Sequence, residues 1–183
     1  MSLVGHNALN QAISNNSAMD PSKIMGDLHE YAANAFNRSE TDQTSDVKDG
    51  MDIALCVYDK QNNTVDYAGA YSPLYIVRDN ELISFKADKI AIGSPDRVGA
   101  TYTTHQIQLQ NNDMMYVFSD GYADQFGGPK GKKFMYRRFR EHLLTLNGKT
   151  MPDQKQILDT ALENWRGSLE QIDDVLVIGM HIA

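Results

Sequence analysis

The chain has 183 residues, of which 42% are hydrophobic and 22% charged, and these fractions are ordinary for a single soluble globular domain with a real core. Its formal net charge of −7 disfavours nucleic acid as a partner, because a polyphosphate attracts a basic surface. The single cysteine, Cys56, excludes an internal disulfide and a cysteine-based zinc cluster.

The sequence also lacks the patterns of membrane insertion and export. No apolar stretch approaches the roughly 20 residues that a membrane-spanning helix needs, and the first residues lack the charged and apolar regions of a signal peptide. Cys56 lies in the apolar run 53–57, where a buried, unreactive thiol is favoured. We therefore expect a reducing, cytoplasmic setting without a membrane segment.

Two helices are predicted at the start of the chain. Apolar residues at helical spacing indicate the first helix, and the polar run 15–17 ends it. Asp20 is then a typical N-cap, since proline follows it at the first helical position, and a second amphipathic helix continues to Phe36. The polar and acidic stretch 38–50 is interpreted as an exposed loop.

Beyond residue 50 the hydrophobic period changes from helical to strand-like. Turn residues at 60–63, 78–81 and 110–113 separate short apolar segments, and 86–97 is irregular. The predicted strands are 52–59, 64–70, 74–78, 82–85, 101–109 and 114–119, followed by helices at 133–146 and 152–165 and a closing strand at 175–182. Successive hairpins between helical segments indicate an α+β protein with an antiparallel sheet rather than an alternating parallel one.

Two acidic segments are the candidate chemical site. Asp120 follows a buried strand and precedes Gly121, while Asp173 and Asp174 stand directly before the last strand. Both segments also have a purely structural interpretation: Asp120-Gly121 as a turn, and Asp173-Asp174 as a solvated loop before the strand. An antiparallel sheet can instead bring the end of one strand beside the start of another, and carboxylates gathered there suit Mg²⁺ or Mn²⁺.

Other chemistries find less support. The histidines have no zinc-like spacing and are interpreted as surface or satisfied side chains: His6, His29, His105, His142 and His181. Ser119 is not in a nucleophile elbow and has no obvious base.

The glycine-rich segment 127–133 lacks the spacing of a phosphate-binding P-loop. One interpretation is a mobile loop that leads into a helix. The other is a lid or docking loop in which Lys130, Lys132 and Lys133 supply positive charge near a phosphorylated partner.

Four motifs in order carry a family resemblance. They are FSDGYADQFGG at 118–128, YAGAYSPLY at 67–75, AIG at 91–93 and QIDDVLVIG at 171–179. Together they resemble the SpoIIE branch of the PPM (type 2C) metal-dependent serine/threonine protein phosphatases, and the resemblance runs from Met1 to the end of the chain.

The resemblance implies an antiparallel β-sandwich of two sheets flanked by helices, with a centre of two Mn²⁺ or Mg²⁺ ions at one edge. In the family these ions activate a water that attacks phosphoserine or phosphothreonine. Asp120 matches the metal-binding Asp of the Asp-Gly motif, with Gly121 beside it. Asp173 matches the metal-binding Asp of the closing motif, and Asp174 follows it. Usual substrates are phosphorylated anti-sigma-factor antagonists, small STAS-domain proteins, and such domains usually end a longer cytoplasmic sensor protein.

One departure from the family is informative. Members of the family carry an Asp-x-x-Gly-His-Gly segment, whose Asp bridges both metals, just ahead of the helix that begins here at Met1. Gly5 and His6 lie inside the helical pattern and are not that motif. We therefore expect a single domain, 1–183, that lacks its opening strands and has weak or no activity alone. The alternative is a non-catalytic module that binds a partner protein, with exposed sheet edges that favour a homodimer.

Overall fold

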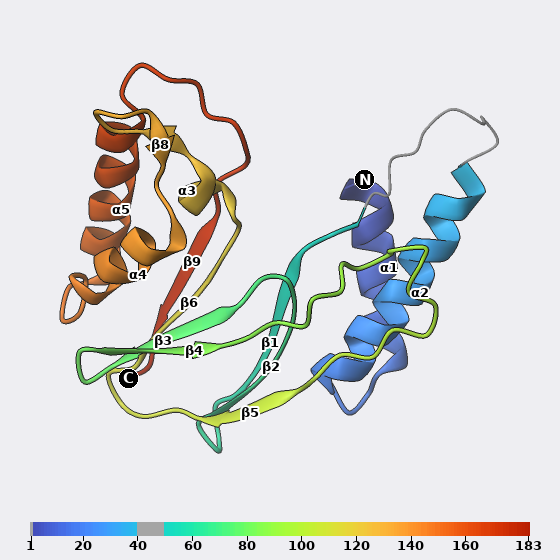
Figure 1. The fold of residues 1–183 in the computed structure, drawn as a ribbon. Coiled ribbons are helices and arrows are strands. Elements are labelled where there is room, and N and C mark those ends of the chain that lie inside the picture. The colour runs from blue at the N-terminus through green and yellow to red at the C-terminus, as the bar shows by residue number, and fades with distance from the viewer. Residues whose placement is uncertain (1, 40–49) are drawn as a thin grey trace. The chain divides into compact units, whose positions relative to one another are not determined.

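The computed structural model describes residues 2–39 and 50–183, and the chain divides into two units (Figure 1). Unit 1 contains Met1–Pro73 and Phe85–Leu109, and unit 2 contains Leu74–Ser84 and Gln110–Ala183. In the described part of the chain, no helix is long and apolar enough to cross a membrane.

Unit 1 begins with the two predicted helices, α1 (Ser2–Asn15) and α2 (Pro21–Ser39). Asp20 caps α2 as expected, because its Oδ1 accepts hydrogen bonds from the Ser22 amide at 3.0 Å and the Ser22 hydroxyl at 2.8 Å. The predicted loop 38–50 begins later than expected, since α2 continues through Ser39. The rest of that prediction, 40–49, lies outside the described residues.

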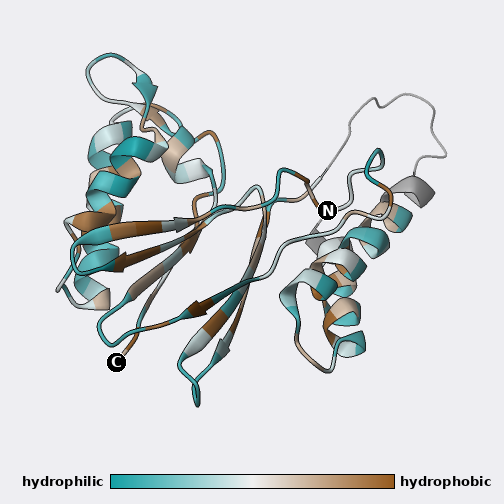
Figure 2. Cartoon of the chain, turned by 60° about the horizontal axis from the view of Figure 1, so that its bottom comes forward, coloured by the Kyte–Doolittle hydropathy of each residue, from teal (hydrophilic) through white to brown (hydrophobic). Residues whose placement is uncertain are grey.

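The sheet of unit 1 has the order β1-β2-β5, with both pairs antiparallel. Its strands are β1 (Ile53–Asp59), β2 (Thr64–Ala70) and β5 (His105–Gln108). The β1–β2 turn lies at the predicted place and has a hydrophilic tip (Figure 2). The predicted strand 101–109 is shorter in the structure, because the Thr103 amide donates to the Asp88 side chain at 2.7 Å instead of to a neighbouring strand.

The core of unit 1 lies between its helices and its sheet. Ala12, Ile24 and Leu28 from the helices pack in one buried cluster with Ala68 and Ala70 of β2. Small alanines on the strand let the helices approach the sheet closely.

The sheet of unit 2 has the order β4-β3-β6-β9, and β6 pairs antiparallel with both of its neighbours. Its strands are β3 (Leu74–Arg78), β4 (Glu81–Phe85), β6 (Met114–Phe118) and β9 (Val177–His181). The left-handed backbone of Asp79 and Asn80, with φ of 50° and 63°, makes the predicted tight turn between β3 and β4. The α+β class with antiparallel sheets is therefore confirmed.

The helices of unit 2 are α3, α4 and α5, and a two-stranded hairpin, β7–β8, separates α3 from α4. Their bounds are α3 (Gly121–Asp124), β7 (Phe126–Gly127), β8 (Lys132–Lys133), α4 (Tyr136–Leu144) and α5 (Met151–Arg166). The Thr150 hydroxyl caps α5 by accepting from the Asp153 amide at 3.3 Å. An aromatic cluster that includes Tyr122, Phe134 and Phe139 fills the core beneath them.

Two predictions on this region were wrong. The glycine-rich segment 127–133 is a hairpin packed on α5 rather than a mobile loop: the Gly128 amide donates to the Trp165 carbonyl at 2.7 Å, and a Cβ on Gly127 would collide with that same oxygen. Helix α4 starts at Tyr136 rather than 133, because the Phe134 amide donates to Gln125 and Met135 has a φ of 74°.

A buried ion pair fixes the start of β6 against β3. Asp113 is fully buried and accepts two hydrogen bonds from the Arg78 guanidinium, at 2.8 and 2.6 Å. Its Oδ2 also accepts from the Gln110 amide at 2.8 Å. The hydrogen bond to Asp113 raises the pKa of Arg78, so the guanidinium stays charged at any pH at which the protein folds.

We expect Arg78→Met to destabilise the protein by about 3–5 kcal/mol, because it leaves the Asp113 carboxylate buried without a counter-ion. Urea unfolding measures this loss. The double variant Arg78→Met/Asp113→Leu should recover most of it, while Arg137→Ala at the exposed Arg137–Glu141 pair should cost at most about 1 kcal/mol. A double variant no more stable than the single one would contradict this account.

Candidate functional site

The two acidic segments lie side by side at one end of the unit 2 sheet. Strands β6 and β9 run antiparallel with Phe118 opposite Val177, so the chain that leaves β6 lies next to the chain that enters β9. Ser119 joins them: its amide donates to the Leu176 carbonyl at 3.0 Å, and its hydroxyl donates to the Asp174 carbonyl at 2.8 Å. The Leu176 amide donates back to the Ser119 hydroxyl at 2.9 Å. One serine therefore holds both segments.

Gly121 allows this close approach. A Cβ built on Gly121 would collide with the Asp174 carbonyl oxygen, which is backbone and has no rotamer by which to move aside. The Asp-Gly pair is not a hairpin turn, because the Asp124 amide donates to the Asp120 carbonyl at 2.9 Å and begins α3. The Asp120 carboxylate makes no capping hydrogen bond to that helix and is exposed.

The second segment also presents its acids to solvent. Asp173 and Asp174 are both exposed. The Asp173 carboxylate accepts from the Asp174 amide at 2.7 Å, and its carbonyl accepts from the Gln171 side chain at 2.8 Å, so this stretch has a defined shape without belonging to a strand. Strand β9 begins only at Val177, two residues later than predicted, because Leu176 bonds to Ser119 on both of its backbone groups.

The ligand chemistry suits a hard divalent cation, but the described residues do not complete a site. Carboxylate and carbonyl oxygens are the donors that Mg²⁺ and Mn²⁺ prefer. Within residues 2–39 and 50–183, however, no group of three or more His, Cys, Asp or Glu side chains gathers close enough to hold one ion. Asp120 and Asp173 lie at the same end of the sheet, where each presents an exposed carboxylate.

The three predicted loop lysines have different surroundings. Lys133 forms an ion pair with Asp124 of α3 at 2.7 Å. Lys130 and Lys132 lie exposed on the β7–β8 hairpin. The hairpin is therefore attached, through Lys133, to the short helix that follows Asp120.

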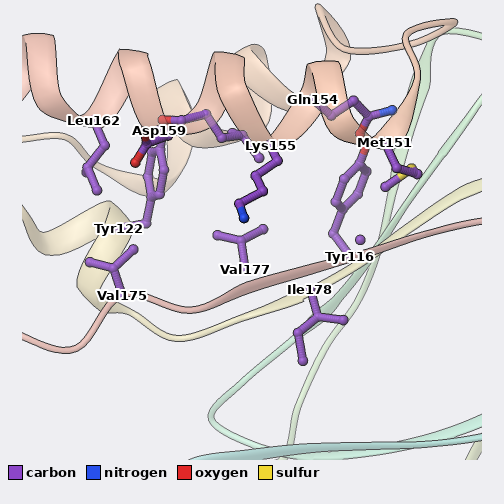
Figure 3. Close-up of a pocket in the computed structure, with 12 residues that line it drawn as sticks. Tyr116, Tyr122, Met151, Gln154, Lys155, Asp159, Leu162, Val175, Val177 and Ile178 are labelled. Atoms are coloured by element: carbon purple, nitrogen blue, oxygen red, sulfur yellow. Dashed lines mark hydrogen bonds between the residues drawn. The ribbon is translucent and has the colours of Figure 1, made fainter.

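The sequence reasoning missed a pocket of about 480 Å³ between α5 and the strands β6 and β9 (Figure 3). Figure 3 shows Lys155 reaching from α5 toward Val177, whereas Ile178 points to the other side of β9. Tyr116 donates its hydroxyl to Gln154 at 2.7 Å, and burial raises its pKa to about 12, so the phenol stays neutral. Only the apolar composition of β6 and of the inner face of α5 signals the pocket in the sequence.

Histidine and cysteine take no part in this site. His29 is buried in unit 1, where its Nδ1 accepts from the Gly93 amide at 3.3 Å and lies 3.1 Å from the Tyr102 hydroxyl. Burial lowers the pKa of His142, which keeps that imidazole neutral. Cys56 is half-buried rather than fully buried, yet desolvation raises its pKa to about 11, which fits an unreactive thiol.

We expect Ser119→Ala to release the Asp173–Asp174 segment from the end of β6. The change removes two hydrogen bonds and should cost about 1–3 kcal/mol of stability. Amide hydrogen exchange should become faster at Leu176, and Ser168→Ala, at an exposed serine after α5, is the control. Unchanged protection of Leu176 in the Ser119 variant would show that the serine does not hold the segment.

Comparisons with known proteins place this architecture in a family. The family described as "Stage II sporulation protein E (SpoIIE)" matches residues 1–183. The SiaA-PP2C domain of Pseudomonas aeruginosa has a similar structure, with a TM-score of 0.86 and 25% sequence identity, over 99% of this chain and 68% of that one. A search of curated proteins finds no match.

More distant structures share the fold. The phosphatase domain of SpoIIE from Bacillus subtilis, presoaked with Mn, gives a TM-score of 0.62 at 16% identity, over 97% of this chain and 73% of that one. The catalytic domain of the serine/threonine phosphatase PstP, in complex with two manganese ions, gives a TM-score of 0.62 at 14% identity. The match covers 98% of this chain and 81% of that one. This chain belongs to the SpoIIE family of PPM (PP2C-type) phosphatase domains.

Proposed function

We propose that this chain takes part in the metal-dependent dephosphorylation of phosphoserine or phosphothreonine on a signalling protein. The observation that carries the proposal is the link through Ser119, which places Asp120 beside the Asp173–Asp174 segment in a chain of the SpoIIE family. These are the two acidic positions that the family motifs assign to metal binding. Asp120 and Asp173 are more than 50 positions apart in the sequence, so an ordinary turn does not explain why they lie side by side.

Mn²⁺ or Mg²⁺ is the proposed cofactor. Asp120 and Asp173 would hold it, with Asp174 beside them, and when bound the ion supplies a Lewis acid and a water nucleophile. The chain's own residues prepare this place: Gly121 permits the close backbone approach, and Ser119 fixes the two segments in register. Within residues 2–39 and 50–183 no third carboxylate joins these two in a metal-binding group. Two carboxylates alone repel each other and bind a cation weakly, so we propose low activity for the 183-residue polypeptide.

The proposed substrate is a cytoplasmic phosphoprotein, of the kind represented by anti-sigma-factor antagonists with a STAS fold. Family membership supports this choice. A single cysteine whose thiol stays protonated is compatible with the reducing cytoplasm. The similar B. subtilis SpoIIE structure is a phosphatase domain and the similar P. aeruginosa structure is a PP2C domain, which supports the same reaction class.

Calorimetric titration of Mn²⁺ tests the metal ligands. We expect weak binding to the wild-type chain, and Asp120→Asn or Asp173→Asn should reduce the affinity by about tenfold or more, since even residues outside the ligand set cost that much. Asp79→Asn is the matched control. It removes the same charge at the end of the unit 2 sheet that lies away from Asp120, and Asn accepts the left-handed backbone of this position.

Equal Mn²⁺ affinity in the wild type and in both site variants would rule out Asp120 and Asp173 as ligands. The same samples should release little phosphate from a phosphoserine peptide. Robust manganese-dependent release by the wild-type chain would contradict the proposed low activity.

A second candidate function, a non-catalytic interaction module, is favoured by the edge of the unit 2 sheet. Among the described strands, β9 pairs only with β6, so its other side is open. Leu176, just before this strand, and Ile178, within it, have exposed fractions of 55% and 53%. An open, apolar edge strand readily adds a strand from another molecule, and a homodimer that pairs β9 with β9 is the simplest such assembly.

Light scattering over a concentration series tests this assembly. We expect dimers at high concentration, and Ile178→Lys should shift the chain to monomers because a charge on an edge strand opposes pairing. The control is Leu169→Lys, at an exposed leucine of unit 2 outside every strand. A wild-type chain that remains monomeric at the highest concentration would exclude the dimer.

A further inference from the structure

Positive charge is concentrated in one short segment of this acidic chain. Residues 130–140 contain six of the 17 lysines and arginines and no acidic residue, so the other residues hold 11 basic against 24 acidic side chains, a balance of −13. The six are Lys130, Lys132, Lys133, Arg137, Arg138 and Arg140. We call residues 130–140 the basic segment. It comprises the end of the β7–β8 hairpin and the first half of α4.

Half of these cations have partners within the protein. Lys133 pairs with Asp124, Arg137 pairs with Glu141, and the Arg138 guanidinium lies 4.3 Å from the centre of the Trp165 ring. The other three, Lys130, Lys132 and Arg140, are exposed and form no ion pair with another described residue. Their charges therefore face solvent.

Exposed apolar side chains lie in the middle of the same segment. Met135 is 57% exposed and Tyr136 is 37% exposed. Met135 has a φ of 74°, a region that unbranched non-glycine residues rarely occupy, and the fold holds it there through a 2.7 Å hydrogen bond from its amide to the Ala123 carbonyl. Strained backbone that presents an apolar side chain to water is typical of binding surfaces.

The basic segment is attached to the element that follows Asp120. Helix α3 is one turn long and directly follows Asp120. At its other end, the Ala123 carbonyl accepts from the Met135 amide, and Asp124 forms an ion pair with Lys133. One helical turn rises about 5.4 Å, so Lys133 and Met135 of the basic segment are held close to the candidate metal ligand. A molecule bound to one is within reach of the other.

We propose that the basic segment is a docking surface for an acidic protein segment that carries apolar side chains, and that it holds a phosphorylated protein beside Asp120. The inference rests on the proposed phosphatase function for its biological meaning. Lys130, Lys132 and Arg140 attract the acids, while Met135 and Tyr136 accept the apolar side chains. A protein segment fits better than a nucleic acid or an anionic membrane, because the remaining balance of −13 repels an extended polyanion.

Fluorescence anisotropy with labelled, unphosphorylated peptides tests the surface. The probe alternates Glu with Leu, and two matched probes replace Glu by Lys or Leu by Ser. We expect the 183-residue chain to bind the Glu/Leu probe, and the affinity should fall as salt is added. It should bind the Glu/Ser probe less tightly and should not bind the Lys/Leu probe.

Two variants separate charge from apolar contact. Lys130→Glu/Lys132→Glu/Arg140→Glu should weaken binding of the Glu/Leu probe by about tenfold or more. Met135→Gly should weaken it severalfold without unfolding α4, because Gly accepts the φ of 74° and ψ of 143° that Met135 adopts. Lys149→Glu is the control, since this exposed lysine of unit 2 lies outside the basic segment.

The proposal is overturned if the wild-type chain does not bind the Glu/Leu probe, or if the triple variant binds it equally well. It is also overturned if oligothymidylate or phosphatidylserine vesicles bind the wild type more tightly than the peptide does. The assay contains no metal and no phosphate, so failure of the metal titration beside intact peptide binding would remove the proposed phosphatase role alone.

Discussion

The hydroxyl of Ser119 is the interaction on which the candidate site depends. It donates to the Asp174 carbonyl and accepts from the Leu176 amide, so a single oxygen ties the exit of β6 to the entry of β9. Gly121 makes the contact sterically feasible, because any Cβ there would meet the Asp174 backbone. Asp120, Asp173 and Asp174 can be exposed, and the segment before β9 irregular, because Ser119 and Gly121 fix the backbone of both acidic segments.

The sequence predicted the strands well wherever local chemistry decides their limits. Strand β2 has the predicted bounds, 64–70, and the β3–β4 turn lies where Asp79 and Asn80 accept a left-handed backbone. The acidic positions were also predictable, since Asp120 and Asp173 flank apolar strands. That they meet at one end of a sheet follows from antiparallel pairing of β6 with β9.

The remainder depends on contacts between distant residues. Residues 127–133 look like a mobile loop until Trp165, more than 30 positions later, supplies the carbonyl and ring on which Gly127 and Gly128 pack. The late start of α4 has the same kind of cause, because Met135 is held by Ala123 in a conformation that its own preference opposes. Helical periodicity contains no information about such contacts.

The pairing of β6 with β9 also has a consequence for biosynthesis. The two strands are joined through three helices and a hairpin, so the sheet cannot be completed until the ribosome has released the residues up to His181. Contacts of such long sequence separation form late and slowly. The nascent chain therefore leaves one edge of β6 unpaired until β9 arrives. Translational arrest in α5 would leave a product in which the Asp173–Asp174 segment never joins Asp120.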